Sequence, residues 1–260
     1  MDTQERVMLV DSLDTGGIVT PFLARARSVA VAPQPIKGTG ECGLIVGSAM
    51  HGCIDGLSVD NKYAVVNTQL LAERAANAKF DSETQPKEWF KHYLRVLSIC
   101  GWTTQGSEFT TYTASERTET LDRVSLSIIH SLGGLNSKLF GRVVERTYGA
   151  LRTNTAVSNR FHSKTTESGS AKFRVLPCMQ TQDGNVVMVL TSMQATSKTQ
   201  STSIANLPGR FWELNCEQTD LRYAAAECML NTHVYNGARA AIEKKLAGNT
   251  ASLIDALDLD

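Results

Sequence analysis

The sequence lacks the short motifs that identify many enzyme families. It contains no GxSxG nucleophile elbow, no HExxH zinc helix, no Walker loop and no closely spaced Cys/His set for zinc. Its histidines stand far apart in the chain, so a Cys–His nucleophile pair could form only through folding. These absences favour a non-enzymatic protein without a metal or a cofactor, with a cysteine-dependent enzyme of unrecognised type as an alternative.

The chain also lacks an excess of charge of either sign. Its 26 Lys and Arg residues balance 26 Asp and Glu residues, so no net field draws it to nucleic acid or to an anionic membrane. Its longest apolar runs, such as residues 43–47, fall far short of the roughly 20 residues that a membrane-spanning helix needs. We therefore expect no nucleic-acid partner and no transmembrane helix.

Signals for export and for disulfide formation are missing as well. The first residues lack the basic-then-apolar order of a secretory signal peptide. The six cysteines lack paired close spacings, which favours reduced, mostly buried thiols. We expect a cytoplasmic protein, which would be released to a host or associated with a membrane if a thiol were acylated.

The clearest positive signal is a β-hairpin centred on Asp183-Gly184. This pair lies between two apolar, β-branched runs, residues 173–179 and 186–191, and Gly supplies the positive φ that a type I′ turn needs. Pro177 removes one ladder donor, so its strand should carry a bulge or an unpaired position.

Helical periodicity recurs on both sides of this hairpin. Ser58 can cap the first helix, Pro86 suits the first turn of the second, and Asn231 or Thr232 can cap the last. The predicted helices span residues 59–78, 87–100, 118–132, 136–151 and 234–246.

Further strands are predicted at residues 102–113, 209–216 and 221–229, and a polar loop at residues 158–169. Helices followed by strands and a final helix indicate an α+β fold, in which an antiparallel β-sheet is covered on one face by amphipathic helices. We expect a single compact domain over residues 51–260.

Residues 1–50 are interpreted as an N-terminal arm or edge segment, with short strands at 7–10 and 28–32. Residues 38–43 match the letters of the dinucleotide fingerprint GxGxxG. Two prolines precede these glycines and more glycines follow where a helix should begin, so we interpret them as a flexible turn.

Two strand cysteines are candidate sites for lipid attachment. Cys178 lies beside the predicted hairpin turn, and Cys216 lies on the strand predicted at 209–216. A thiol facing an apolar cavity could hold a bound fatty acid or a thioester-linked acyl chain, each buried CH₂ contributing roughly 0.8 kcal/mol. The alternative is that each is a buried cysteine that packs as a small hydrophobe.

Four blocks of sequence resemble one family. Residues 56–62, 67–72, 89–102 and 231–239 occur in the order found in the Evf family, which comprises an Erwinia virulence factor and related bacterial and fungal proteins. This resemblance implies an α/β fold with a palmitoyl chain linked to a buried cysteine, for which Cys178 and Cys216 are the candidates.

The resemblance also implies a role. We expect a virulence or insect/host-interaction factor with a buried apolar cavity, whose partner is a lipid or a host membrane. Self-association is a further expectation, since neutral charge and predicted sheet edges are typical of a structural or self-assembling protein, the alternative function.

Overall fold

The computed structural model of the protein describes residues 1–16, 36–106, 109–114, 118–132, 134–167, 170–198, 213–217, 219–247 and 250–259. The helices within these ranges are α1 (Thr3–Ser12), α2 (Val59–Lys79), α3 (Pro86–Ile99), α4 (Leu121–Leu132), α5 (Ser137–Thr153), α6 (Thr155–Thr165) and α7 (Thr232–Lys245), with 3₁₀ turns η1 (Gly134–Asn136) and η2 (Thr250–Leu253). The strands are β1 (Cys42–Val46), β2 (Ala49–Cys53), β3 (Trp102–Gly106), β4 (Thr110–Thr111), β5 (Thr118–Thr120), β6 (Thr166–Glu167), β7 (Ser170–Gln180), β8 (Val186–Ser197), β9 (Glu213–Asn215), β10 (Thr219–Leu230) and β11 (Ile254–Asp258).

Most strands form one mixed sheet. Its order is β11-β1-β2-β7-β8-β10-β3, with β4 paired to β10 and β6 paired to β7, while β5 and β9 form a separate pair. Every pairing in the described residues is antiparallel except that of β2 with β7, which is parallel. The expected α+β fold is confirmed, and the sheet is antiparallel, as expected, except at the β2–β7 pair.

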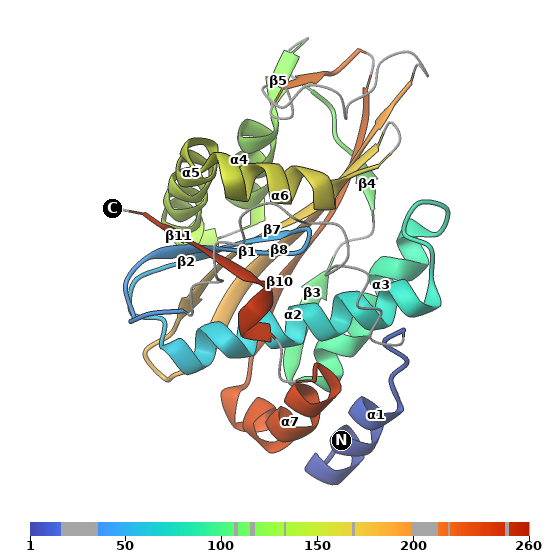
Figure 1. Ribbon diagram of the computed structural model, residues 1–260, viewed down its shortest axis with the longest axis vertical. Coiled ribbons are helices and arrows are strands. Elements are labelled where there is room, and N and C mark those ends of the chain that lie inside the picture. Colours follow the sequence, from blue (N-terminus) through green and yellow to red (C-terminus); the bar gives the residue numbers. More distant parts are fainter. Residues whose placement is uncertain are drawn as a thin grey trace.

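Helices cover both faces of this sheet (Figure 1). Leu176 and Leu190 point into a core that they share with α1, α2, α3 and α7. Val175 and Val189, one residue away on the same strands, point into a second core under α4, α5 and α6. The expectation that helices cover one face is therefore wrong, because successive residues of a strand point to opposite faces and both sets are apolar here.

The hairpin is confirmed, but its turn differs from the predicted one. Gly184 has a φ of +83°, whereas the only described residue other than glycine with a positive φ is Ala247, so the turn is not type I′. A five-residue loop closes instead through the Thr181 and Asn185 backbones, whose N···O distance is 2.8 Å. Pro177 sits opposite Gly52, and the pairing with β8 skips Leu176 and Pro177 without shifting the register, so there is no bulge.

The predicted helices with strong caps are present. The Ser58 side chain accepts a hydrogen bond from the Asn61 amide at 3.3 Å, and the Asn231 side chain accepts one from Val234 at 3.1 Å. Helix α2 is buried on most of its circumference, including the whole Lys62 side chain, rather than along the single face that periodicity indicated. Helix α4 starts later than predicted, because residues 118–120 form β5.

Two predicted segments are wrong. Residues 7–10 lie in α1 rather than in a strand, because Asp2 caps a helix by accepting the Glu5 amide at 2.8 Å. Residues 158–165 continue α6 rather than forming a loop, because Asn154 caps that helix through the Val157 amide.

The predicted turn at the glycines is confirmed. Residues 38–40 bend and lead into β1, and the buried Lys62 ammonium binds the carbonyl oxygens of Gly38 and Gly40 at 3.1 and 2.8 Å. The strand predicted at 28–32 and part of that at 209–216 lie outside the described residues. The division of the chain at residue 50 stays a prediction; β1, within that segment, pairs with β2 and β11.

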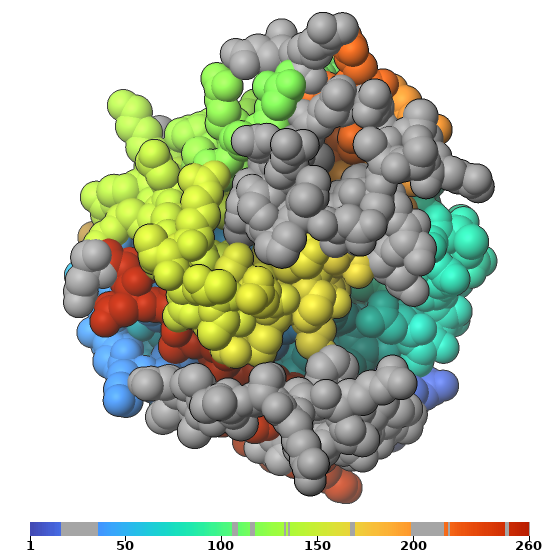
Figure 2. Space-filling model, turned by 45° about the horizontal axis from the view of Figure 1, so that its top comes forward, coloured from blue at the N-terminus to red at the C-terminus, as the bar shows by residue number. Residues whose placement is uncertain are grey.

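The C-terminal strand is held at the surface beside α6 (Figure 2). Arg160 of α6 binds both carboxylate oxygens of Asp255 at 2.7 and 3.0 Å. No helix among the described residues is long and apolar enough to cross a membrane.

Two paired glycines allow α5 to approach the sheet closely. Gly43 of β1 lies opposite Gly52 of β2. A Cβ atom on Gly43 would meet Thr147 Cγ2 at 2.7 Å, and one on Gly52 would meet Val143 Cγ1 at 3.0 Å. The helix therefore rests directly on backbone at this pair.

We expect Gly43→Ala to lower the free energy of unfolding by about 1–3 kcal/mol through overpacking. Thr147→Ser in the same chain should recover part of this loss, since it removes the methyl group that the new Cβ meets. Gly40→Ala, where nothing lies within 4 Å of the new Cβ, is the control. Urea unfolding measures all three, and equal costs for Gly43→Ala and Gly40→Ala would contradict the prediction.

Candidate functional site

Four of the six cysteines lie in one row across the sheet. Cys42, Cys53 and Cys178 are direct neighbours on β1, β2 and β7, and the row continues through Met188 on β8 to Cys228 on β10. The Sγ atoms of Cys178 and Cys53 are 3.7 Å apart, and Cys178 has no exposed surface. The row depends on strand register, which the sequence did not reveal.

Three thiols of this row, those of Cys42, Cys53 and Cys228, are poor nucleophiles. A hydrogen bond with Cys53, followed by burial, raises the pKa of Cys42, and a hydrogen bond with Cys178 raises that of Cys53. Burial raises the pKa of Cys228. Since the thiolate is the reactive form, these three residues pack rather than react at neutral pH.

The second lipid-attachment candidate, Cys216, lies elsewhere. It is half-buried and packs against the core under α4–α6, whereas Cys178 belongs to the core under α2. Cys216 borders a hollow of about 140 Å³ together with Tyr112 and Leu221. The structure does not bring Cys178 and Cys216 together.

The other notable buried titratable group is His51 on β2. It is 1% exposed, its Nδ1 lies 3.4 Å from the Leu44 carbonyl oxygen, and its Nε2 has no hydrogen-bond partner among the described residues. Burial, with the charge of Arg174 as a smaller contribution, lowers the pKa of His51 to about 4. The ring is therefore neutral in the folded protein at neutral pH.

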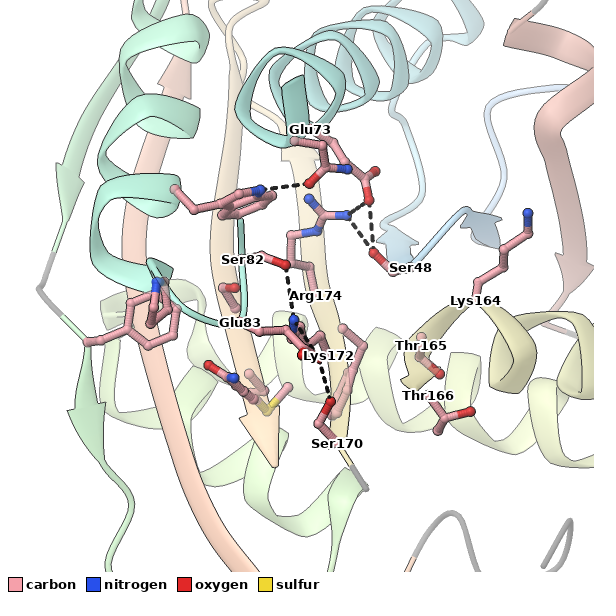
Figure 3. A pocket seen from close by; sticks show the side chains of 18 of the residues that line it. Ser48, Glu73, Ser82, Glu83, Lys164, Thr165, Thr166, Ser170, Lys172 and Arg174 are labelled. Atoms are coloured by element: carbon pink, nitrogen blue, oxygen red, sulfur yellow. Dashed lines mark hydrogen bonds and ion pairs between the residues drawn. The ribbon is translucent and has the colours of Figure 1, made fainter. Parts of the chain in front are cut away.

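A polar pocket lies between β7 and α6 (Figure 3). We call it the β7–α6 pocket; its volume is about 510 Å³. Strands β7 and β8 form its floor, α2, α3 and the loop between them form one wall, and the end of α6 forms the other.

A buried ion pair closes one end of the pocket. The Arg174 Nη2 atom lies 2.6 Å from Glu73 Oε1 and 2.8 Å from Ser48 Oγ, and Arg174 is 3% exposed. The guanidinium carbon lies 5.5 Å from the centre of the Trp89 ring and 5.3 Å from that of Tyr93, within cation–π range. The Nη1 atom has no hydrogen-bond partner among the described residues.

A second, more exposed cluster lies two residues earlier on β7. The Lys172 ammonium contacts Glu83 Oε1 and Ser82 Oγ, each at 3.1 Å, and Ser170 donates to Glu83 at 2.9 Å. The hydrogen bond from Ser170 and the contact with Lys172 lower the pKa of Glu83. Lys164 of α6 lies on the facing wall, and burial lowers its pKa.

The side chains that line the pocket are mainly polar. Its described lining contains hydroxyls, amides, carboxylates and cations but no histidine or cysteine. Sequence reasoning missed it, although Lys172 directly precedes the strand predicted at 173–179 and Arg174 lies within that strand. Two cations at strand spacing on a strand buried on both faces were the available signal.

Comparison with known proteins finds only distant likeness. No protein-family model and no curated protein matches the chain. A solved delta-endotoxin structure has 13% identity and a TM-score of 0.44, covering 80% of this chain and 96% of that one. The activated Cyt2Ba monomer of Bacillus thuringiensis subsp. israelensis has 11% identity and a TM-score of 0.42, covering 72% and 98%.

The structure of the Evf virulence factor has 12% identity and a TM-score of 0.34, covering 74% of this chain and 72% of that one. The chain is thus similar, at low identity, to Evf and to Cyt-type endotoxins. Because all three TM-scores are below 0.5, we draw no functional conclusion from this likeness.

The Arg174–Glu73 pair gives a prediction about stability. Glu73→Ala should cost about 3–5 kcal/mol, because it leaves the buried guanidinium uncompensated. The double variant Glu73→Ala/Arg174→Met should be less destabilised than Glu73→Ala, since it removes that charge as well. Glu243→Ala, which breaks the exposed pair with Arg239, is the control and should cost about 0–1 kcal/mol. A double variant less stable than Glu73→Ala would contradict this account.

His51 gives a prediction about pH. Its folded pKa of about 4 lies below the unfolded value of 6.5, so below pH 6.5 the unfolded chain takes up a proton that the folded chain excludes. The free energy of unfolding should therefore fall by about 3 kcal/mol as the pH drops from 6.5 toward 4. His51→Gln should be less stable at neutral pH but should show a shallower fall, as measured by urea unfolding. Parallel curves for the two proteins would rule out this role for His51.

Proposed function

We propose that this protein is a non-enzymatic virulence or host-interaction factor that acts by binding lipid surfaces. The main support is that the four sequence blocks resembling the Evf family meet in space. Trp102 donates from its indole nitrogen to Thr68 Oγ1 at 2.9 Å, joining the third block to the second.

The fourth block joins the same unit. The Asn231 amide donates to the Gly101 carbonyl oxygen at 3.1 Å, and the Arg239 guanidinium lies 3.4 Å from the Asp60 carboxylate in the first block. A Cβ atom on Gly101 would lie 3.1 Å from Val234 Cγ1, so this junction also requires a glycine. Blocks that are distant in sequence and adjacent in space support a shared architecture.

The non-enzymatic part of the proposal has separate support. The thiols of Cys42, Cys53 and Cys228 have raised pKa values, and the described lining of the β7–α6 pocket contains no cysteine or histidine. Both observations favour binding over a cysteine-dependent reaction.

We further propose S-acylation of Cys178 or Cys216, with a palmitoyl-type chain. Their environments imply different routes. Cys216 is half-buried beside a hollow and can be reached in the folded protein, whereas Cys178 has no exposed surface and would have to be acylated before folding ends.

Flotation with phosphatidylcholine vesicles, combined with intact-mass measurement before and after hydroxylamine, tests both parts. We expect the protein to float, with little change between about 0.05 M and 0.5 M salt, because a chain of zero net charge must associate mainly through apolar contacts. Hydroxylamine should remove one acyl mass and weaken flotation.

The two parts can fail separately. An intact mass equal to the bare chain would refute acylation without touching lipid binding. Protein that stays at the bottom of the gradient with the phosphatidylcholine vesicles would refute the lipid-surface role.

A further inference from the structure

Two buried thiols in the row of four cysteines are close enough to bind one ion. Cys53 and Cys178 lie opposite each other on β2 and β7, with their Sγ atoms 3.7 Å apart, and are 1% and 0% exposed. Two metal–sulfur bonds of roughly 2.3 Å, the Zn–S length, can span sulfur atoms up to about 4.6 Å apart. One ion therefore fits between these thiols with little movement of the strands.

The number and type of these ligands favour one metal. Thiolates are soft ligands and select Cu(I), which is stable with two of them, whereas structural Zn(II) takes four ligands. Among the described residues, no group of three or more His, Cys, Asp or Glu side chains could hold a metal ion. A pair of thiols therefore suits Cu(I) better than it suits Zn(II).

A buried cation lies beside the thiols. Lys62 of α2 is 0% exposed, and among the described residues its ammonium binds the carbonyl oxygens of Gly38 and Gly40 rather than a carboxylate. Its charge also acts on Cys42 and Cys53, whose pKa values are raised mainly by a hydrogen bond with a neighbouring thiol and lowered slightly by Lys62. A buried charge without a counterion is costly, so Lys62 indicates that an anion forms beside it.

The charges of the thiol pair and the lysine match once an ion is bound. Cu(I) forms one bond to each thiolate of Cys53 and Cys178, and the two thiol protons pass to solvent. Two thiolates and one Cu(I) ion carry a net charge of −1, which the +1 charge of Lys62 neutralises.

We propose that Cys53 and Cys178 bind one Cu(I) ion, with the Lys62 ammonium as its counterion. Cys42 lies opposite Cys53 on β1, is half-buried and lines a hollow of about 720 Å³, so it gives the ion a route from the surface. The site does not depend on the proposed lipid-surface role. Acylation of Cys178 would block it, whereas acylation of Cys216 would not.

Anaerobic titration of the reduced, hydroxylamine-treated full chain with Cu(I), in competition with bicinchoninate, tests the proposal. We expect one equivalent to bind, with X-ray absorption showing coordination by sulfur alone. Cys178→Ala should weaken Cu(I) binding at least about a hundredfold, since the loss of even an outer-shell residue costs about 10–100-fold. Cys100→Ala removes an equally buried cysteine outside the row and should leave binding unchanged.

The variant Lys62→Met tests the charge match. Two thiolates and one Hg(II) ion form a neutral complex, which needs no counterion. The variant should therefore weaken Cu(I) binding about ten- to a hundredfold and leave Hg(II) binding, measured in competition with dithiothreitol, unchanged. Equal weakening of both metals would refute the role of Lys62 as counterion, because damage to the fold affects both.

Other results would overturn the site itself. Failure of the chain to take Cu(I) from bicinchoninate would refute it, and nitrogen or oxygen ligands in the absorption spectrum would refute the thiol pair. Equal losses in Cys178→Ala and Cys100→Ala would refute the location. If Cys178→Ala does not fold by circular dichroism, Cys53→Ala replaces it with the same expected loss, and the absorption spectrum of the unmodified chain still decides the ligands.

Discussion

Burial of both faces of the long central strands is the constraint on which the rest of the fold depends. Strands β7, β8 and β10 carry apolar residues at successive positions, so two separate cores form, one under α1, α2, α3 and α7 and one under α4, α5 and α6. A sheet apolar on both faces must be covered twice, and burial at roughly 25 cal/mol per Å² provides the drive. The close approach of α5 to the sheet then requires the paired glycines Gly43 and Gly52. The row of four cysteines lies on the opposite face, which α2 covers.

One part of the sheet departs from this pattern of apolar faces and carries buried polar and charged side chains. At the start of β7 the face toward α2 becomes polar, and Arg174 is buried against aromatic rings and one carboxylate. A buried guanidinium seldom adds net stability over an apolar residue of similar size, so stability does not explain it. The same strand has the apolar Phe173 and Val175 on its other face, where the core under α5 and α6 is continuous. The polar patch is therefore a local feature of one face, as expected for a binding surface.

Local signals in the sequence predicted much of the fold. Asp183-Gly184, Ser58 and Asn231 act on neighbouring residues, and the hairpin, α2 and α7 are found where these residues place them.

Features set by distant partners were not predictable. The parallel pairing of β2 with β7 brings Cys53 to Cys178 across 125 positions, and the row of four cysteines depends on this pairing together with those of the neighbouring strands. Helix α1 was predicted as a strand because Val7 to Val10 are apolar, and the cap at Asp2 decided otherwise. The site was harder still, since its residues come from β7, β8, α2, α3 and α6.

The resemblance and the pocket involve different parts of the molecule. The four blocks form the layer of α2, α3, β3 and the start of α7, joined through Trp102, Gly101 and Arg239. Of the residues that line the β7–α6 pocket, only Trp89 belongs to a block. The pocket is therefore formed almost entirely by residues outside the four blocks. Arg174 connects the layer to the pocket, because its guanidinium rests on Trp89 and Tyr93 of that layer while its partners Glu73 and Ser48 line the pocket.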